Sequence, residues 1–252
     1  MSRYSLCGWL SFSSEGCSTF PLSWVSNQFR RDAWVARQAA SVPDGAKVLD
    51  IGAGTAPYRR LFAHCEYCTH DFGKEPSTAG HYAKLDYTSD ITAIPAPDAS
   101  FDVLLCTEVL EHVPDPVAAL REMARLLKPG GRLFLTAPLG SWLHQQPYHY
   151  YGGFTPDWYY RFLPEHGLDV TSLEPNGHFF LFFAQEGCRF SALIDPRRTP
   201  RRLLIWPCLF ALWLVTLPFL RVLFPMLARP LDGLGLENVC TVGYHVVAVR
   251  KH

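Results

Sequence analysis

One short run of the sequence combines a carboxylate with two glycines, residue types that could together bind a charged ligand. Asp50 precedes Gly52 and Gly54, directly after a short apolar segment. Glycine lets the backbone turn tightly and lets a ligand approach where a Cβ would clash. In doubly wound α/β folds, ligands sit outside the carboxyl ends of the strands, which is where such a turn lies. A dinucleotide would fit this turn as well as a smaller nucleoside.

Neighbouring residues favour a cationic nucleoside over a dinucleotide. The dinucleotide fingerprint requires a small residue three places after Gly54, where this chain has Pro57. The carboxylate of Asp50 would repel a pyrophosphate, whereas it would attract ammonium and sulfonium groups. Asp71, about 20 residues downstream, suits the hydroxyls of a ribose in either class of cofactor. The alternative for Asp71 is a solvated loop aspartate.

Alternating strand-like and helix-like segments surround these residues. This order predicts βαβ units, and hence a doubly wound, Rossmann-like α/β fold with a seven-stranded, mostly parallel sheet and helices on both faces. The last strand has a length and alternation that suit a sheet edge. The expected strands are 47–51, 65–70, 83–86, 101–106, 132–137, 168–173 and 239–249, and the expected helices are 28–40, 59–63, 116–127 and 155–166.

The chain is expected to divide into four parts. Residues 1–44 form an N-terminal segment and helix, and residues 45–177 form the cofactor-binding core. Residues 178–237 are an apolar helical insertion before the last strand, and residues 238–252 complete the core sheet.

Several runs resemble, in order and spacing, the motifs of one enzyme family. Residues 48–55 are similar to motif I of class I S-adenosylmethionine (SAM)-dependent methyltransferases, and residues 97–103 to the segment that leads into the fourth strand. Residues 108–113 and 127–131 are similar to the segments that flank the next helix. The resemblance is to the methyltransferase type 11 group and covers about residues 45–175.

The resemblance implies SAM as cofactor and a set of residues that bind it. Ala56 and Pro57 depart from the pattern, because many members have another glycine there. Gly52, Ala53 and Gly54 would line the methionine end of SAM, Asp50 would orient that loop and the amino group, Asp71 would hold the ribose, Asp90 would accept from the adenine amino group, Ile91 would lie beside the ring, and Thr107 would lie near the methionine moiety.

Histidines after the fifth expected strand could act on the acceptor. Residues 138–154 are rich in His and Tyr, and loops at this place lie over the reactive end of the cofactor in this fold. Methyl transfer requires alignment of the nucleophile and, where needed, removal of its proton. We expect His144 or His149 to be the general base. The alternative is an aromatic lid whose histidines are solvated.

No metal site is expected. Cys65 and Cys68 could form half of a zinc site, but no second Cys/His pair follows at zinc spacing. Glu111 and His112 also suggest metal or acid–base chemistry. Because they lie in the segment that resembles the family, we expect them to position other groups.

Residues 203–227 are almost all apolar and are interrupted by three prolines. Their length permits a membrane span. Because the last strand returns to the sheet, a single crossing is excluded. We expect a kinked segment or hairpin that dips into one leaflet or lies at the membrane surface. Arginines at 197, 198, 201 and 202 suit an anionic cytoplasmic surface. The alternatives are an internal helical cap and a dimer interface.

Composition and charge bear on the partners and the location of the protein. Lys+Arg and Asp+Glu both number 23, so no net charge steers the chain onto nucleic acid. Cysteines inside apolar runs favour a reducing compartment, and the N-terminus has no clear signal peptide. We therefore expect a cytoplasmic enzyme, peripheral on the inner membrane face.

The combined expectation is a SAM-dependent methyltransferase that acts, at oxygen, on a small or lipid-linked acceptor. One alternative is the same enzyme with a soluble small-molecule acceptor. Another is a non-catalytic partner protein with a SAM fold. The acceptor, the methylated atom and the oligomeric state are left open by the sequence.

Overall fold

The computed structural model describes residues 25–74, 81–196, 205–234 and 240–252. The chain divides into two compact units. Of these described residues, the sheet unit contains those within 31–174 and 243–252, and the helical unit contains 25–30 and those within 175–242. The four-part division expected from the sequence stays a prediction.

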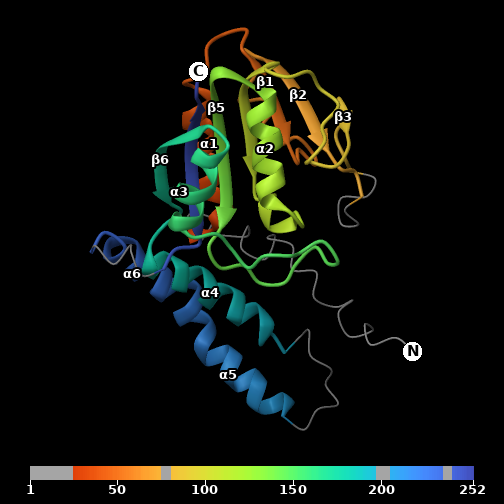
Figure 1. The fold of residues 1–252 in the computed structure, drawn as a ribbon. Helices are drawn as coiled ribbons and strands as arrows, with labels where there is room; N and C mark the ends of the chain where they lie inside the picture. Colours follow the sequence, from red (N-terminus) through yellow and green to blue (C-terminus); the bar gives the residue numbers. More distant parts are fainter. Residues whose placement is uncertain (1–24, 75–80, 197–204, 235–239) are drawn as a thin grey trace. The chain divides into compact units, whose positions relative to one another are not determined.

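The sheet unit has seven strands in the order β3-β2-β1-β4-β5-β7-β6 (Figure 1). Four strand pairs, β1–β2, β1–β4, β2–β3 and β4–β5, are parallel, and β5–β7 is antiparallel. The doubly wound, mostly parallel sheet expected from the sequence is therefore confirmed. The strands are β1 (Lys47–Ile51), β2 (Glu66–Asp71), β3 (Tyr87–Thr88), β4 (Phe101–Thr107), β5 (Leu127–Pro138), β6 (Leu168–Pro175) and β7 (Gly243–Arg250).

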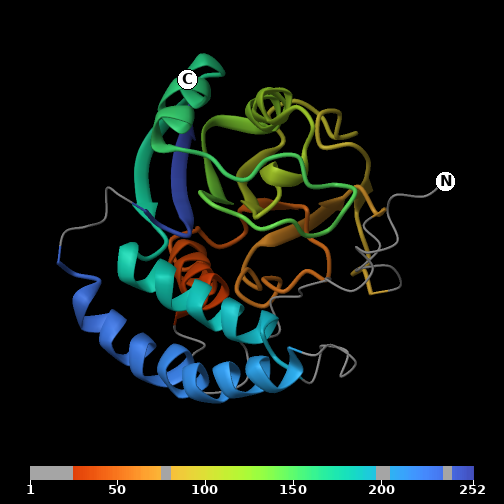
Figure 2. The ribbon, with the colours of Figure 1, turned by 90° about the horizontal axis from the view of Figure 1, so that it is seen from below.

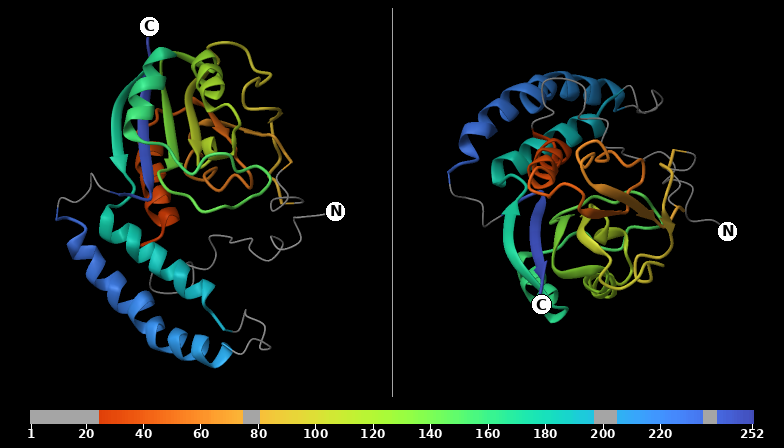
Figure 3. Two further views of the ribbon diagram at one scale, coloured as in Figure 1. Left: turned by 60° about the horizontal axis from the view of Figure 1, so that its bottom comes forward. Right: turned by 90° about the horizontal axis from the view of Figure 1, so that it is seen from above.

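Alternating strand residues form two separate buried clusters, one for each face of the sheet. Leu49 of β1 packs in the cluster that contains Met123 and Tyr159, whereas its neighbour Val48 packs in the cluster that contains Trp34. Helices therefore cover both faces, as expected (Figure 3). They are α1 (Asn27–Ala39) on one face, and α2 (Pro116–Leu126) and α3 (Pro156–Glu165) on the other.

The position expected for the last strand is wrong. β7 lies between β5 and β6 rather than at the edge. It pairs with β5 from Arg132↔Val249 to Pro138↔Gly243. Its first four residues are all buried, because sheet neighbours and packed helices enclose an interior strand on all sides.

Two local predictions between β1 and β4 are also wrong. Residues 57–64 form turns rather than a helix. Their backbone hydrogen bonds span three residues, as from Arg59 N to Ala56 O (3.3 Å) and from Leu61 N to Tyr58 O (2.9 Å), the spacing of a turn and not of an α-helix. The third strand is Tyr87–Thr88 rather than 83–86. Asp86 accepts hydrogen bonds from Thr69 N (2.8 Å) and Oγ1 (3.0 Å), which keeps the segment before β3 outside the ladder.

The helical unit contains α4 (Phe179–Leu193), α5 (Trp206–Pro218), a π-helical turn η5 (Phe219–Leu223) and α6 (Phe224–Leu231). The last three join into one helix of 26 residues, Trp206–Leu231, and α4 runs alongside it (Figure 2). Asp232 accepts hydrogen bonds from His178 N and Leu181 N and so caps the start of α4.

The 26-residue helix is apolar and exposed. Its mean hydropathy reaches 1.9, none of its most apolar window is buried inside the structure, and its length is sufficient to cross a membrane. The helix contacts α4 through Ser191, whose carbonyl accepts from Trp213 Nε1 (3.1 Å) and whose Oγ accepts from Arg221 Nε (2.8 Å). Residues 203–204 of the expected apolar segment and the four arginines that precede them lie outside the described residues.

Candidate active site

The sheet brings the expected cofactor residues to one edge. β1 is parallel to both β2 and β4, with Ile51 opposite His70 on one side and Cys106 on the other. Asp50 precedes Ile51, Asp71 follows His70, and Thr107 follows Cys106. The three side chains therefore lie at neighbouring strand ends, where ligands bind in this class of fold.

The turn after β1 requires glycine at position 52. Gly52 has a φ of 72°, and a Cβ there would lie 2.4 Å from Val109 Cγ2. The carbonyl of His70 accepts from Gly52 N (2.8 Å) and Ala53 N (2.9 Å), which ties the turn to the end of β2. The backbone here can therefore approach a ligand closely and is held in place for it.

Asp71 is fixed beside the glycine turn. It is 7% exposed, and its two carboxylate oxygens accept from Gly54 N (3.1 Å) and Gly73 N (2.9 Å). A carboxylate offers about four lone-pair sites, so two bonds leave capacity for ribose hydroxyls. The alternative of a solvated loop aspartate does not fit this burial.

The carboxyl group of Asp50 is buried and accepts a hydrogen bond. It is 2% exposed and accepts a short hydrogen bond from Tyr67 Oη. Burial raises the pKa of Asp50 to about 7, an effect that the Asp71 charge increases and that the Tyr67 hydrogen bond and Arg59 oppose. An ammonium group placed beside this carboxyl would favour its ionised form.

The residues expected at the adenine lie beyond β3. His70 Nε2 lies 3.1 Å from the carbonyl oxygen of Ser89, which holds this segment against β2. Asp90 is exposed, and the pKa of its carboxyl is lowered by hydrogen bonds from Thr92 N (2.9 Å) and Oγ1 (2.7 Å). Ile91 is buried and contributes an apolar surface. Their roles toward the cofactor stay predictions.

Two residues of the site edge were missed from the sequence. Arg31 of α1 donates from Nε to Tyr58 Oη (2.9 Å), and Tyr58 follows the glycine turn. Glu108, directly after β4, has a left-handed φ of 54° and accepts from Thr136 Oγ1 (2.8 Å). Arg31 Nε also lies 3.5 Å from Asp32 Oδ1, so a charged pair from α1 holds Tyr58 in place after the turn. Nothing in the sequence indicated Arg31, because no rule of residue spacing relates a residue of α1 to this turn.

The loop after β5 folds onto the turn η4 (Leu110–His112). The carbonyl of Glu111 accepts from Tyr150 N (2.9 Å) and Tyr151 N (3.2 Å), and His112 Nδ1 lies 2.6 Å from the carbonyl oxygen of Tyr148. These contacts fix the His- and Tyr-rich loop over the carboxyl end of β4.

As a result, three imidazoles gather at the site. The ring centroids of His112 and His144 are 4.7 Å apart, those of His144 and His149 are 4.7 Å apart, and those of His112 and His149 are 5.7 Å apart. Burial and the neighbouring His144 lower the pKa of His149. The two loop histidines expected to act on the acceptor therefore contact a third one, His112, that sequence reasoning treated separately.

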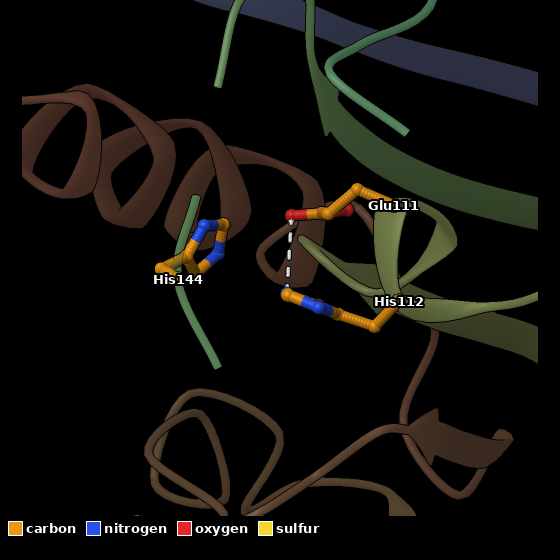
Figure 4. A group of neighbouring side chains, drawn as sticks. All are labelled: Glu111, His112 and His144. Carbon is orange, nitrogen blue, oxygen red and sulfur yellow. Dashed lines mark ion pairs between the residues drawn. The ribbon is translucent and has the colours of Figure 1, made fainter. Parts of the chain in front are cut away.

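A buried carboxyl completes this cluster. Glu111 is 1% exposed, and its Oε1 lies 3.7 Å from His112 Nε2 (Figure 4). Burial and the nearby Glu108 raise the pKa of Glu111. One ligand atom each of Glu111, His112 and His144 lie within 4.8 Å of one another, so these side chains could also hold a metal ion.

A family model described as a methyltransferase domain matches residues 27–186. The chain belongs to this family. SAM is therefore its cofactor, and its assignment to the class I SAM-dependent methyltransferases is confirmed. The carboxyl ends of β1, β2 and β4, where the expected cofactor residues meet, are the candidate SAM-binding edge.

Curated relatives of this methyltransferase carry the name ubiquinone biosynthesis O-methyltransferase. The protein of Aliivibrio fischeri (strain MJ11) is 37% identical over 103 residues, which cover 36% of this chain and 44% of the relative. That of Aeromonas salmonicida is 35% identical over 123 residues, which cover 44% and 50%. This methyltransferase thus spans about half the length of these relatives at most.

Solved structures share the fold at low identity. The [4+2]-cyclase SpnF has a TM-score of 0.52 at 17% identity, with 88% of this chain and 80% of that chain covered. An S-adenosylmethionine dependent methyltransferase from Mesorhizobium loti has a TM-score of 0.51 at 15% identity, with 89% and 98% covered. These likenesses support the fold alone.

Proposed function

We propose that the protein transfers the methyl group of SAM to a hydroxyl oxygen of a small or lipid-linked acceptor at the cytoplasmic face of a membrane. The observation that supports this chemistry is the His112–His144–His149 cluster beside the candidate SAM-binding edge. The printed name of the curated relatives, O-methyltransferase, supports oxygen as the acceptor atom.

The residues divide the work of this reaction. The methyl carbon of SAM is already activated by the sulfonium, so the protein has to align the acceptor oxygen with it and remove the hydroxyl proton. Asp50, Asp71 and the glycine turn hold the cofactor. His144 or His149 receives the proton, and Glu111, through His112, keeps the imidazoles in place.

The exposed helix supports the membrane surface as the place of action. Val215, Leu214 and Met226 are 74%, 56% and 63% exposed. Apolar surfaces of this extent mark interaction sites.

Two observations indicate that the helix does not cross the membrane. β6 and β7 are neighbours in one sheet, so the chain that leaves after β6 returns to the same side. Arg221 donates a hydrogen bond to Ser191 of α4, and placing its charge at the centre of a bilayer costs free energy. Both points favour a helix that lies in the interface.

Lipid and small-molecule extracts of cells with and without the protein would test the proposal. Mass spectrometry should find a species that is heavier by one CH₂ group only where the active protein is present. The same species should be missing with Asp71→Ala, which removes the ribose contact. A product methylated at nitrogen or carbon contradicts the oxygen assignment. Sedimentation of the protein with lipid vesicles tests the membrane contact. A protein that stays entirely in the supernatant contradicts the membrane assignment and favours a soluble acceptor.

A further inference from the structure

An aromatic groove of about 550 Å³ lies between α4 and the η5–α6 part of the long helix. Two ring pairs show how its walls are built: Phe179 and Phe183 of α4 have centroids 4.7 Å apart, and Phe219 and Phe224 of the long helix have centroids 5.9 Å apart. We call this the Phe groove. Its phenylalanines are Phe179, Phe180, Phe183, Phe190, Phe219 and Phe224.

The backbone keeps this groove open. Gly187 of α4 contributes no side chain to the lining, and a Cβ there would lie 3.3 Å from Leu220 Cδ2. The π-helical turn Phe219–Leu223 shifts the facing residues out of the regular α-helical register, a local change that is frequent at functional sites. Phe180 and Phe224 also pack against the buried cluster of the unit, so the groove has a fixed base.

The lining selects an uncharged ligand. Glu186 is the single ionisable residue among the described residues that line the groove. Its Oε1 lies 2.6 Å from Arg189 Nη1, and this ion pair neutralises its charge. A phosphate or carboxylate would find no cation in the lining, whereas a hydrocarbon chain would contact aromatic rings along the whole groove. The size falls within the range of about 300–1,000 Å³ that is usual for small-molecule sites.

We propose that the Phe groove binds the hydrocarbon tail of the lipid-linked acceptor. This inference rests on the proposed function and names the tail as the part of the acceptor that the helical unit recognises. Continuity of surface supports this occupant, because Phe219, Leu220 and Phe224 belong both to the groove and to the exposed apolar helix. A tail can therefore pass from lipid into the groove without leaving apolar contact.

Photolabelling can test the groove directly. The full-length protein, without vesicles, is irradiated with a medium-chain fatty alcohol that carries a diazirine, and labelled peptides are mapped by mass spectrometry. We expect labels in 179–190 and 219–224. Gly187→Met, which fills the groove against the movable end of Leu220, should reduce the labelling at least fivefold. Gly233→Met is the matched control, because a side chain there meets open space, and it should label as the wild type does.

A second variant guards against misfolding. Phe183→Glu places a charge on a ring that is 44% exposed, and it should reduce labelling without repacking the unit. Equal labelling of wild type, Gly187→Met and Phe183→Glu overturns the proposal, as does labelling confined to 206–215. A methylated cellular product without a hydrocarbon tail overturns the choice of occupant.

Vesicle sedimentation of the same proteins separates this inference from the proposed function. Sedimentation with vesicles but no label in the groove overturns the tail site and leaves the membrane contact standing. Label in the groove without sedimentation supports the tail site and contradicts the membrane contact.

Discussion

The sheet unit buries ionisable carboxyl groups, whereas the helical unit exposes apolar side chains. Asp50 and Glu111 are 2% and 1% exposed, but Val215 is 74% exposed. A buried carboxyl needs a partner that stabilises its charge. In the sheet unit, neighbouring donors or a bound cationic cofactor can be that partner. An exposed apolar helix needs a partner that removes it from water. The two units therefore suit different partners, a cationic nucleoside for the sheet unit and a hydrocarbon phase for the helical unit.

The largest effect is expected at Gly52. Gly52→Ala adds both a strained φ and a Cβ at 2.4 Å from Val109, so SAM binding should weaken by about 100-fold or more, roughly 2.7 kcal/mol. Gly45→Ala is the matched control, because Gly45 has a φ of 73° but no atom within 4 Å of the added Cβ. It should lose only the strain energy, about 1–2 kcal/mol of stability, and bind SAM normally. Titration calorimetry measures both.

Next comes Asp71. Asp71→Asn removes the charge and one acceptor oxygen beside the glycine turn, and we expect about 10- to 100-fold weaker SAM binding, ~1.4–2.7 kcal/mol. Asp44→Asn, at an exposed turn, should bind SAM as the wild type does. Equal affinities of Asp71→Asn and wild type would refute the ribose assignment.

A pH dependence follows from Asp50. Its pKa in the folded protein is about 7, so the carboxyl is protonated below pH 7, and SAM binding should weaken as the pH falls from 8 to 6. Tyr67→Phe removes a hydrogen bond that lowers this pKa and should move the binding profile to higher pH. A pH-independent dissociation constant would contradict the contact between Asp50 and the amino group.

The same pKa gives the sign of a stability effect. The folded state of Asp50 binds a proton more tightly than the unfolded state, whose pKa is 3.8. Between pH 4 and pH 7 the folded protein thus holds more protons, and the contribution of Asp50 to stability falls as the pH rises through this window. Urea unfolding without SAM should show this decrease, and Asp50→Asn should reduce it.

The smallest effect is expected on the helical unit. Leu214→Ser with Val215→Ser removes two exposed apolar side chains. Full burial of such a side chain contributes about 1.5–3 kcal/mol, and partial immersion should still give a roughly tenfold loss of vesicle binding. Leu61→Ser, on the sheet unit and 37% exposed, is the control. Sedimentation with anionic vesicles checks both, and equal losses would contradict the assignment.

Local sequence patterns predicted which residues meet at the candidate cofactor edge. Gly52, Gly54 and Asp50 are neighbours in the chain, so their geometry follows from one turn. Asp71 was predictable because parallel strands bring their carboxyl ends to one edge. The order of strands was harder, since the pairing of β7 with β5 is a non-local choice that its own residues do not determine.

The acceptor side shows where prediction stopped. The contact of His112 with His144 and His149 depends on how the loop after β5 bonds to η4. Tyr150 N and Tyr151 N donate to the carbonyl of Glu111, and the carbonyl oxygen of Tyr148 lies 2.6 Å from His112 Nδ1. No pattern in the sequence predicts the conformation of that loop. The left-handed φ of Glu108 and Ala56 is equally invisible, because neither residue type is usual there.

One paired measurement tests the central claim, that the two units have separate partners. SAM affinity and vesicle binding are measured for wild type, Asp71→Asn, and Leu214→Ser with Val215→Ser. We predict that Asp71→Asn loses only SAM affinity and that the helix variant loses only vesicle binding. The account would be contradicted if either variant lost both SAM affinity and vesicle binding. It would also be contradicted if both variants kept both properties.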